Sequence, residues 1–290
     1  MSRLRHGFGA QGRGSGAQGR LAETFDRVRA GNNGPGLVTY VTAGDPDLPR
    51  TEGILRALDR AGADVLEVGV PFSDPLADGP AIQRATERAL AAGGSLKATL
   101  ALVAGVRADV RAPIVIFSYA NPLMRMGLDR FAREAAAAGV DGVLALDLPI
   151  EEAHELHTAL TAVGLDTIFL LSPTTTDARI RKAAELGSGF LYGISRLGVT
   201  GARDTVASGA EALVGRIRAH TALPIALGFG ISTPAHVREV CGYADAAVVG
   251  SALVSLIAEA GESPALVDRV AAYVRWLKGD GVSIHDNFHS

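Results

Sequence analysis

The segment AGADVLEVG, residues 61–69, decides the fold because the same kind of junction returns twice further along the chain. An amphipathic stretch ends at Gly62, Asp64 follows two residues later, and a short apolar run begins at once. The pattern recurs at residues 138–146 and 163–171, again with glycine and then aspartate before an apolar run. A glycine just past a helix adopts the left-handed conformation that ends it, so the repeat predicts helix–turn–strand units.

Eight short apolar segments are expected to be the strands of these units. They are rich in Val, Ile and Leu without strict alternation, which is typical of parallel strands buried on both faces. The segments are residues 37–42, 64–68, 114–118, 142–146, 167–171, 190–193, 225–228 and 246–249. Helical patterns lie between them. Eight strands with right-handed crossovers favour a single closed α/β barrel of the (β/α)8 or TIM type over an open doubly wound sheet.

The two ends of the chain differ in composition from the repeats. Residues 1–20 hold four arginines and no acid among many Gly, Gln, Ser and Ala, so we expect a disordered arm and not a signal peptide. The barrel is expected over residues 21–278, with an extra N-terminal helix at residues 21–30. Residues 279–290 are expected to form a flexible tail.

Composition and charge argue against several classes of protein. The chain has 290 residues, 48% of them hydrophobic and 20% charged, with a formal net charge of −3. This balance gives no indication of a nucleic acid or a membrane surface as partner. Cys241 is the single cysteine, so no internal disulfide is expected, and apolar runs never approach the ~20 residues of a membrane span. We therefore expect a cytoplasmic protein.

A carboxylate lies inside the second apolar strand, in the segment VLEVGVPFSDPLADGPAIQ at residues 65–83. Burial raises the pKa of a carboxyl group, so Glu67 suits a group that gives and takes a proton near neutral pH. Asp74 and Asp78 follow in a long connection, and long connections of a barrel carry its chemistry at the C-terminal face. The alternative is structural: Glu67 pairs with an arginine, and the two aspartates cap turns.

Glycine-rich turns follow the sixth, seventh and eighth strands. They are YGISRLGVTG at residues 192–201, LGFGIST at 227–233 and GSALV at 250–254. Such turns bring backbone N–H groups and a helix N-terminus close to an anion, and barrels commonly bind phosphate there. The alternative is that these glycines only permit tight turns. A dinucleotide fingerprint is not expected, because Thr233 occupies its third glycine position.

Residue types that would supply an electron sink or bind a metal are not placed at strand ends. None of the three lysines, Lys97, Lys182 and Lys278, follows a strand, which argues against a Schiff base or bound pyridoxal phosphate. None of the seven histidines does either. His154 and His157 share a helix face with Glu151, which is more typical of a surface helix than of a metal site.

The segment from Leu66 to Gln83 resembles the signature L-E-x-G-x-P-F-S-D-P-x-A-D-G-P-x-I-Q of tryptophan synthase α chains at every fixed position. Similar segments continue through most of the chain: YVTAGDP at 40–46, SYANP at 118–122, LDLPIEE at 146–152 and the late glycine-rich turns. The resemblance covers about residues 21–278. It departs from the family at Phe190, where tyrosine is common, and at Tyr40, where phenylalanine is common.

The resemblance implies a lyase that splits indole-3-glycerol phosphate into indole and glyceraldehyde 3-phosphate in L-tryptophan biosynthesis, by acid–base catalysis without a metal or Schiff base. Glu67 would protonate indole C3 and then take a proton from the glycerol hydroxyl group, while Asp78 would hold the indole N–H. The family's other substrate contacts correspond to Tyr40, Tyr119, Tyr192, Thr200, Gly201, Gly230, Gly250 and Ser251.

The resemblance also implies a partner. The chain would be the α subunit of an αββα heterotetramer, with pyridoxal phosphate in the β subunit and no cofactor of its own. Asp74 and its loop would face that subunit, and closure of the loops after the second and sixth strands would be coupled to it. Two alternatives stay open: a freestanding indole-glycerol-phosphate lyase, and a non-catalytic phosphosugar-binding activator. The presence of both Glu67 and Asp78 disfavours the activator.

Overall fold

The structure is a computed structural model that describes residues 19–31, 34–194, 209–228 and 230–280. Most of the expected arm and tail, and the expected site residues Thr200 and Gly201, therefore lie outside the described residues.

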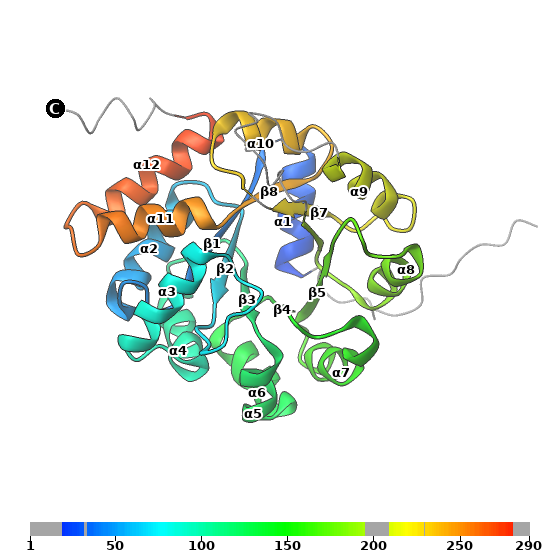
Figure 1. Ribbon diagram of the computed structural model, residues 1–290, viewed down its shortest axis with the longest axis horizontal. Coiled ribbons are helices and arrows are strands. Elements are labelled where there is room, and N and C mark those ends of the chain that lie inside the picture. Colours follow the sequence, from blue (N-terminus) through cyan, green and yellow to red (C-terminus); the bar gives the residue numbers. More distant parts are fainter. Residues whose placement is uncertain (1–18, 32–33, 195–208, 229, 281–290) are drawn as a thin grey trace, which may run out of the picture.

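Eight parallel strands close into a barrel in the order β1 to β8, so the (β/α)8 prediction is confirmed (Figure 1). Each predicted strand agrees with an observed one to within about one residue at either end. The strands are β1 Gly36–Thr42, β2 Val65–Gly69, β3 Ile114–Ser118, β4 Gly142–Ala145, β5 Asp166–Leu171, β6 Leu191–Ile194, β7 Ile225–Gly228 and β8 Ala246–Val249.

Helices follow the strands and surround them (Figure 1). Their bounds are α1 Arg20–Arg29, α2 Leu48–Arg60, α3 Pro80–Ala91, α4 Leu96–Val106, α5 Ala120–Met126, α6 Leu128–Ala138, α7 His154–Ala162, α8 Asp177–Leu186, α9 Gly209–Arg218, α10 Pro234–Cys241, α11 Ser251–Ala260 and α12 Leu266–Lys278. A 3₁₀ turn at Ile150–Glu152 precedes α7. The long interval after β2 contains the loop 70–79 and one extra helix, α3, which packs against β1 and α11.

The expected N-terminal helix, α1, covers the end of the barrel at which the strands begin, its N-terminal end. Leu21 and Phe25 of α1 are buried among side chains of the barrel interior, such as Val38 and Val115. The rings of Phe25 and Phe190 lie 5.3 Å apart between centroids. Phe190, one of the two departures from the family pattern, therefore packs at this N-terminal end of the barrel. A second, larger core lies between the strands and the outer helices.

The repeated aspartate of the junctions has a structural function that the sequence did not reveal. In two of the three repeated junctions, at Asp64 and Asp141, the Oδ2 atom accepts a backbone N–H at the start of the preceding strand, and Asp245 before β8 does the same. The donor–acceptor distances are 2.9 Å for Leu37 to Asp64, 2.8 Å for Ile114 to Asp141 and 2.7 Å for Ile225 to Asp245. Each aspartate therefore satisfies a backbone donor at the start of a strand, where the ladder of the sheet provides no partner.

The junction glycines adopt the left-handed conformation that the repeat predicts. Their φ angles are 97° at Gly62, 85° at Gly139 and 79° at Gly164. A Cβ atom at Gly139 would also lie 2.4 Å from Cγ of Arg107, whereas at Gly164 it would meet nothing within 4 Å. The guanidinium group of Arg107 donates to the Ala112 carbonyl over 3.0 Å and to Asp141 over 3.3 Å, so this side chain cannot easily move away.

Gly139→Ala is therefore expected to be more destabilising than its matched control Gly164→Ala. The control carries only backbone strain, about 1 kcal/mol. Gly139→Ala adds the steric overlap with Arg107 and is expected to cost roughly 2–4 kcal/mol. Urea unfolding of the two variants measures the difference, and equal losses of unfolding free energy would contradict the packing described for Arg107.

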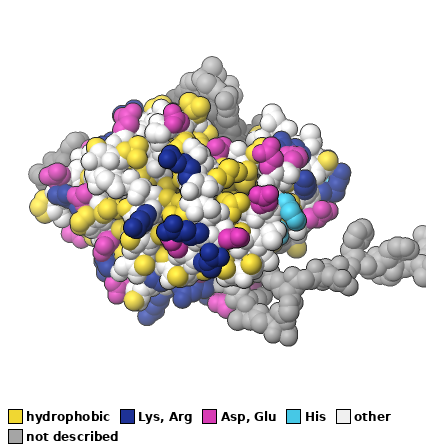
Figure 2. Space-filling model, turned by 90° about the horizontal axis from the view of Figure 1, so that it is seen from below, with side chains coloured by type: hydrophobic (Ala, Val, Ile, Leu, Met, Phe, Trp, Pro, Cys, Tyr) yellow, Lys and Arg dark blue, Asp and Glu magenta, His cyan; other side chains and the backbone are white. Residues whose placement is uncertain are grey.

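Charged side chains of both signs are interspersed on the face shown in Figure 2. No single helix within the described ranges is long and apolar enough to cross a membrane. Taken together, α3 and α4 have the length and composition of a membrane span, but the two helices are bent by 89° relative to each other.

Candidate active site

A cavity of about 440 Å³ opens at the C-terminal end of the barrel. Its middle is apolar, with side chains from several strand ends and from α3, among them Ile82, Phe117, Leu146, Leu170 and Val248. Polar groups lie around this apolar middle: Tyr40, Asp78, Tyr192, Gly230, Ser232, Gly250 and Ser251. A concave apolar site with a few polar groups is the usual form of a small-molecule site.

Two side chains outside the loop hold Asp78 in position. The hydroxyl group of Tyr119 donates to Oδ2 of Asp78 over 3.1 Å and accepts the backbone N–H of Ala77 over 3.0 Å. Nε2 of Gln83, in the first turn of α3, donates to the carbonyl groups of Pro75 and Asp78 over 3.2 and 2.9 Å. Burial raises the pKa of Asp78 above its ordinary value, and the Tyr119 hydrogen bond opposes that rise.

Glu67 points into the barrel interior. It lies two residues after Val65, an interior residue, and successive side chains of a strand alternate between faces. The Glu67 side chain is fully buried, and within the described part of the chain neither carboxylate oxygen has a hydrogen-bond partner. The structural alternative, a pair with an arginine, is therefore wrong. Desolvation by burial raises the pKa of Glu67 to about 8.

Two tyrosines of the cavity wall lie close to Glu67. Tyr40 is paired with Glu67 in the register of β1 and β2, and its hydroxyl group contacts Thr42 Oγ1 at 3.4 Å. Burial raises the pKa of Tyr192 well above its ordinary value, and the nearby Glu67 carboxylate adds to this rise. Gly69 is required where it stands, because a Cβ atom there would lie 2.2 Å from the Tyr40 hydroxyl oxygen.

The raised pKa of Glu67 predicts how stability depends on pH. Because the folded-state pKa lies near 8 and the ordinary value is 4.5, the folded state binds the proton more tightly than the unfolded state. The stabilising contribution of this proton is complete below pH 4.5 and is lost as pH rises through 8. Glu67→Gln should therefore gain stability relative to the unmodified chain between pH 5 and pH 9, on the order of 4 kcal/mol.

Urea unfolding at the two pH values measures this gain, with Glu23→Gln as the matched control because Glu23 is exposed on α1. The control is expected to gain almost nothing. If the difference in unfolding free energy between Glu67→Gln and the unmodified chain were the same at pH 5 and pH 9, Glu67 would not be the group that binds this proton.

The opposite end of the cavity is built from backbone. Gly230 follows β7 with a φ of 71°, and Gly250 precedes the first residue of α11, Ser251. No side chain caps α11 at Gly250, so its first N–H groups are available to a ligand. Backbone donors and a helix dipole at one place favour an anion.

The structure brings most of the expected site residues together. Six of the ten line the cavity. Tyr119 binds Asp78, and Glu67 is buried beside Tyr40 and Tyr192 of the cavity wall. Thr200 and Gly201 fall outside the described residues. Sequence reasoning missed the hydrogen bonds of Gln83 and a pair behind the cavity. In that pair, Nε of Arg88 on α3 lies 2.7 Å from Oδ1 of Asp45, a buried carboxylate after β1. Neither interaction has a local sequence signal.

No group of three or more His, Cys, Asp or Glu suitable for a metal ion occurs among the residues with described positions. His154 is exposed on α7, and Nδ1 of His157 contacts Thr167 Oγ1 at 3.2 Å.

Comparison with known proteins identifies the family. A family model described as tryptophan synthase alpha chain matches residues 25–279. The tryptophan synthase alpha chain of Geotalea uraniireducens is 50% identical over 259 residues, 89% of this chain and 96% of the relative. Tryptophan synthase subunit alpha from Legionella pneumophila superposes with a TM-score of 0.83 at 36% identity, over 91% of this chain and 98% of that one. For a chain of the tryptophan synthase structure from Mycobacterium tuberculosis the TM-score is 0.82 at 39% identity, with 91% and 98% covered. The chain therefore belongs to the tryptophan synthase alpha chain family.

Proposed function

We propose that the cavity binds indole-3-glycerol phosphate and that Glu67 and Asp78 cleave it to indole and glyceraldehyde 3-phosphate. As a member of its family the chain is a lyase of tryptophan biosynthesis. One observation carries the assignment to these two residues. The fully buried carboxyl group of Glu67, which has no hydrogen-bond partner among the described residues, lies beside a cavity that holds a second carboxylate on its wall.

The two ends of the cavity suit the two ends of this substrate. The phosphate group is proposed to bind the backbone N–H groups at Gly230, Gly250 and Ser251, where donors of α11 are uncapped. The indole ring is proposed to lie in the apolar middle, where Phe117 and Leu170 contribute to the wall. The carboxylate of Asp78, held by Tyr119, is proposed to face the ring N–H.

Cleavage of the carbon–carbon bond needs an electron sink, and the indole ring provides it. The neutral carboxyl group of Glu67 protonates C3, which turns the ring into an iminium tautomer. The ionised Asp78 carboxylate accepts the ring N–H and stabilises the positive charge. The Glu67 carboxylate then removes the hydroxyl proton on C1′. As that oxygen becomes a carbonyl, the C3–C1′ bond breaks, its electron pair returns to the ring, and Glu67 is again protonated.

This chain is proposed to need no cofactor of its own. The electron sink belongs to the substrate, and the three lysines lie away from the cavity, Lys97 on α4, Lys182 on α8 and Lys278 on α12. Pyridoxal phosphate is proposed to belong to the β subunit. The catalytic unit is proposed to span residues 21–278.

The partner is proposed to be a tryptophan synthase β subunit, in an αββα assembly of the cytoplasm. Direct transfer to a second active site is useful because indole is apolar and would leave a cell. Exposed apolar side chains after two strand ends support a docking face on the cavity side. Leu76, in the same loop as Asp74, is 90% exposed, and Met124 of α5, which follows β3, is 52% exposed.

An assay of indole release, without and with added β subunit, tests both proposals. We expect weak but measurable cleavage by the isolated chain, rising at least tenfold as β subunit is titrated in. Indole release that does not change over the titration would favour a freestanding lyase, and no release under any condition would remove the proposed activity.

A further inference from the structure

A second hollow, of about 460 Å³, lies at the end of the barrel opposite the active-site cavity. Its wall includes Asp64, which precedes β2, and Ala112, which precedes β3, so it lies at the N-terminal ends of the strands. The active-site cavity is lined by residues that follow the C-terminal ends. Because all eight strands are parallel, the two hollows open on opposite faces.

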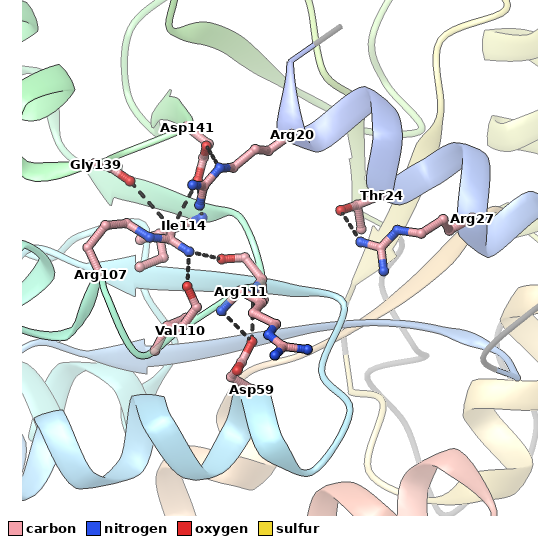
Figure 3. A network of polar contacts seen from close by, with 11 residues as sticks. Arg20, Thr24, Arg27, Asp59, Arg107, Val110, Arg111, Ile114, Gly139 and Asp141 are labelled. Atoms are coloured by element: carbon pink, nitrogen blue, oxygen red, sulfur yellow. Dashed lines mark hydrogen bonds and ion pairs between the residues drawn. The ribbon is translucent and has the colours of Figure 1, made fainter.

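Three arginine side chains of this wall come from three different parts of the chain: Arg27 from α1, Arg60 from the end of α2 and Arg111 from the turn before β3. All three are exposed. Among the described residues none of them forms an ion pair with a carboxylate, and the one side-chain hydrogen bond is from Arg27 to Thr24 Oγ1 at 2.8 Å. Figure 3 marks one contact of the Arg27 guanidinium group, to Thr24, and none of the Arg111 guanidinium group.

The carboxylates of the same wall are already engaged. Asp64 pairs with Lys278 at 2.8 Å, and Asp109 pairs with Arg56 at 2.8 Å. Oδ1 of Asp59 accepts the backbone N–H groups of Arg111 and Ala112 over 3.0 and 2.7 Å (Figure 3). Arg56 also pairs with Glu52 at 3.1 Å, so with all these partners included five positive side chains stand against four negative ones. The hollow therefore carries a positive surplus of one charge, and the three arginines of its wall have no carboxylate partner among the described residues.

We infer that this hollow is a second binding site, for a small anion that carries phosphoryl groups. Guanidinium groups present planar pairs of donors that match phosphate oxygens, and they remain charged at any physiological pH. Arg27, Arg60 and Arg111 reach the hollow from three different elements. A tetrahedral phosphoryl group suits this arrangement, because its oxygens accept hydrogen bonds from several directions at once. A planar carboxylate offers only two oxygens. The volume admits an anion of at least pyrophosphate size.

Arg56 and Asp59 of α2 already contact the turn before β3, so an anion bound here would add α1 to this group of contacts. The ligand would bridge α1, α2 and the turn between α4 and β3. A ligand that binds only the folded state stabilises that state. The stability of the N-terminal end of the barrel would therefore rise with the concentration of the anion.

Isothermal titration calorimetry with inorganic pyrophosphate tests the inference on the full chain. The unmodified chain is compared with Arg60→Gln/Arg111→Gln and with Arg133→Gln, an exposed arginine of α6 that serves as the matched control. We expect the double variant to lose a pyrophosphate site or to bind there at least tenfold more weakly, and each single variant to bind at least threefold more weakly. The control should bind as the unmodified chain does, and the KM for indole-3-glycerol phosphate should be unchanged throughout.

Two results would overturn the inference. If the double variant and the control bind pyrophosphate equally, the arginines do not form a site. If citrate binds the unmodified chain as tightly as pyrophosphate and competes with it, the ligand is not selected by its phosphoryl groups. Thermal midpoints without ligand check that all variants remain folded.

Discussion

Glu67→Gln is expected to lower the rate of indole release at least a thousandfold while the fold is retained. Glutamine has nearly the same volume as glutamic acid, so the packing of this fully buried side chain is preserved. The amide can neither protonate C3 of the indole ring nor remove the hydroxyl proton. General acid–base groups contribute roughly 10²–10⁴ in rate, and here one group acts in both steps.

The measurement is single-turnover indole release with β subunit present, combined with the affinity for an uncleavable indole-alkyl phosphate. The affinity for this analogue should change less than fivefold, since its ring nitrogen and phosphate are proposed to bind Asp78 and the backbone at Gly230, Gly250 and Ser251. Glu23→Gln on α1 is the matched control and should keep the full rate. Turnover of Glu67→Gln within tenfold of the unmodified chain would remove Glu67 from the acid–base role.

Asp78→Asn is expected to slow cleavage by about two to three orders of magnitude. The variant keeps an acceptor oxygen for the Tyr119 hydroxyl group, so the loop geometry is preserved. It loses the negative charge that stabilises the protonated ring, and such stabilisation in a water-poor site is large. The loss should appear in kcat more than in KM, because the charge develops only after C3 is protonated.

Asp129→Asn provides the control for this substitution, since Asp129 is exposed on α6, outside the cavity lining. It should leave cleavage unchanged. Near-normal single-turnover cleavage by Asp78→Asn would refute the role at the indole nitrogen.

Local rules were sufficient to predict the barrel. The strands are short apolar runs, and the glycines that end the helices must adopt positive φ, so both leave a mark in the sequence that does not depend on distant residues. The position of Glu67 was also predictable, because a carboxylate inside an apolar strand has few environments available. Its side chain is fully buried, and burial raises its pKa in the expected direction.

Interactions between distant segments were not predictable in the same way. The Tyr119 hydroxyl group reaches Asp78 across 41 positions of sequence, and Arg88 reaches Asp45 across 43. The sequence also did not separate α3 from the long connection after β2, because its small apolar face, with Ala85 and Ala89, becomes recognisable only against β1 and α11. Which aspartate side chains accept strand N–H groups likewise depends on the closed barrel.

The most direct test of the two-carboxylate site is a crystal structure of the chain with an uncleavable indole-alkyl phosphate bound. We expect the ring nitrogen within hydrogen-bond distance of the Asp78 carboxylate, C3 facing the Glu67 carboxyl group, and the phosphate on the N–H groups at Gly230, Gly250 and Ser251. An analogue whose ring lies away from both carboxyl groups, or whose phosphate lies elsewhere, would contradict the two-carboxylate site.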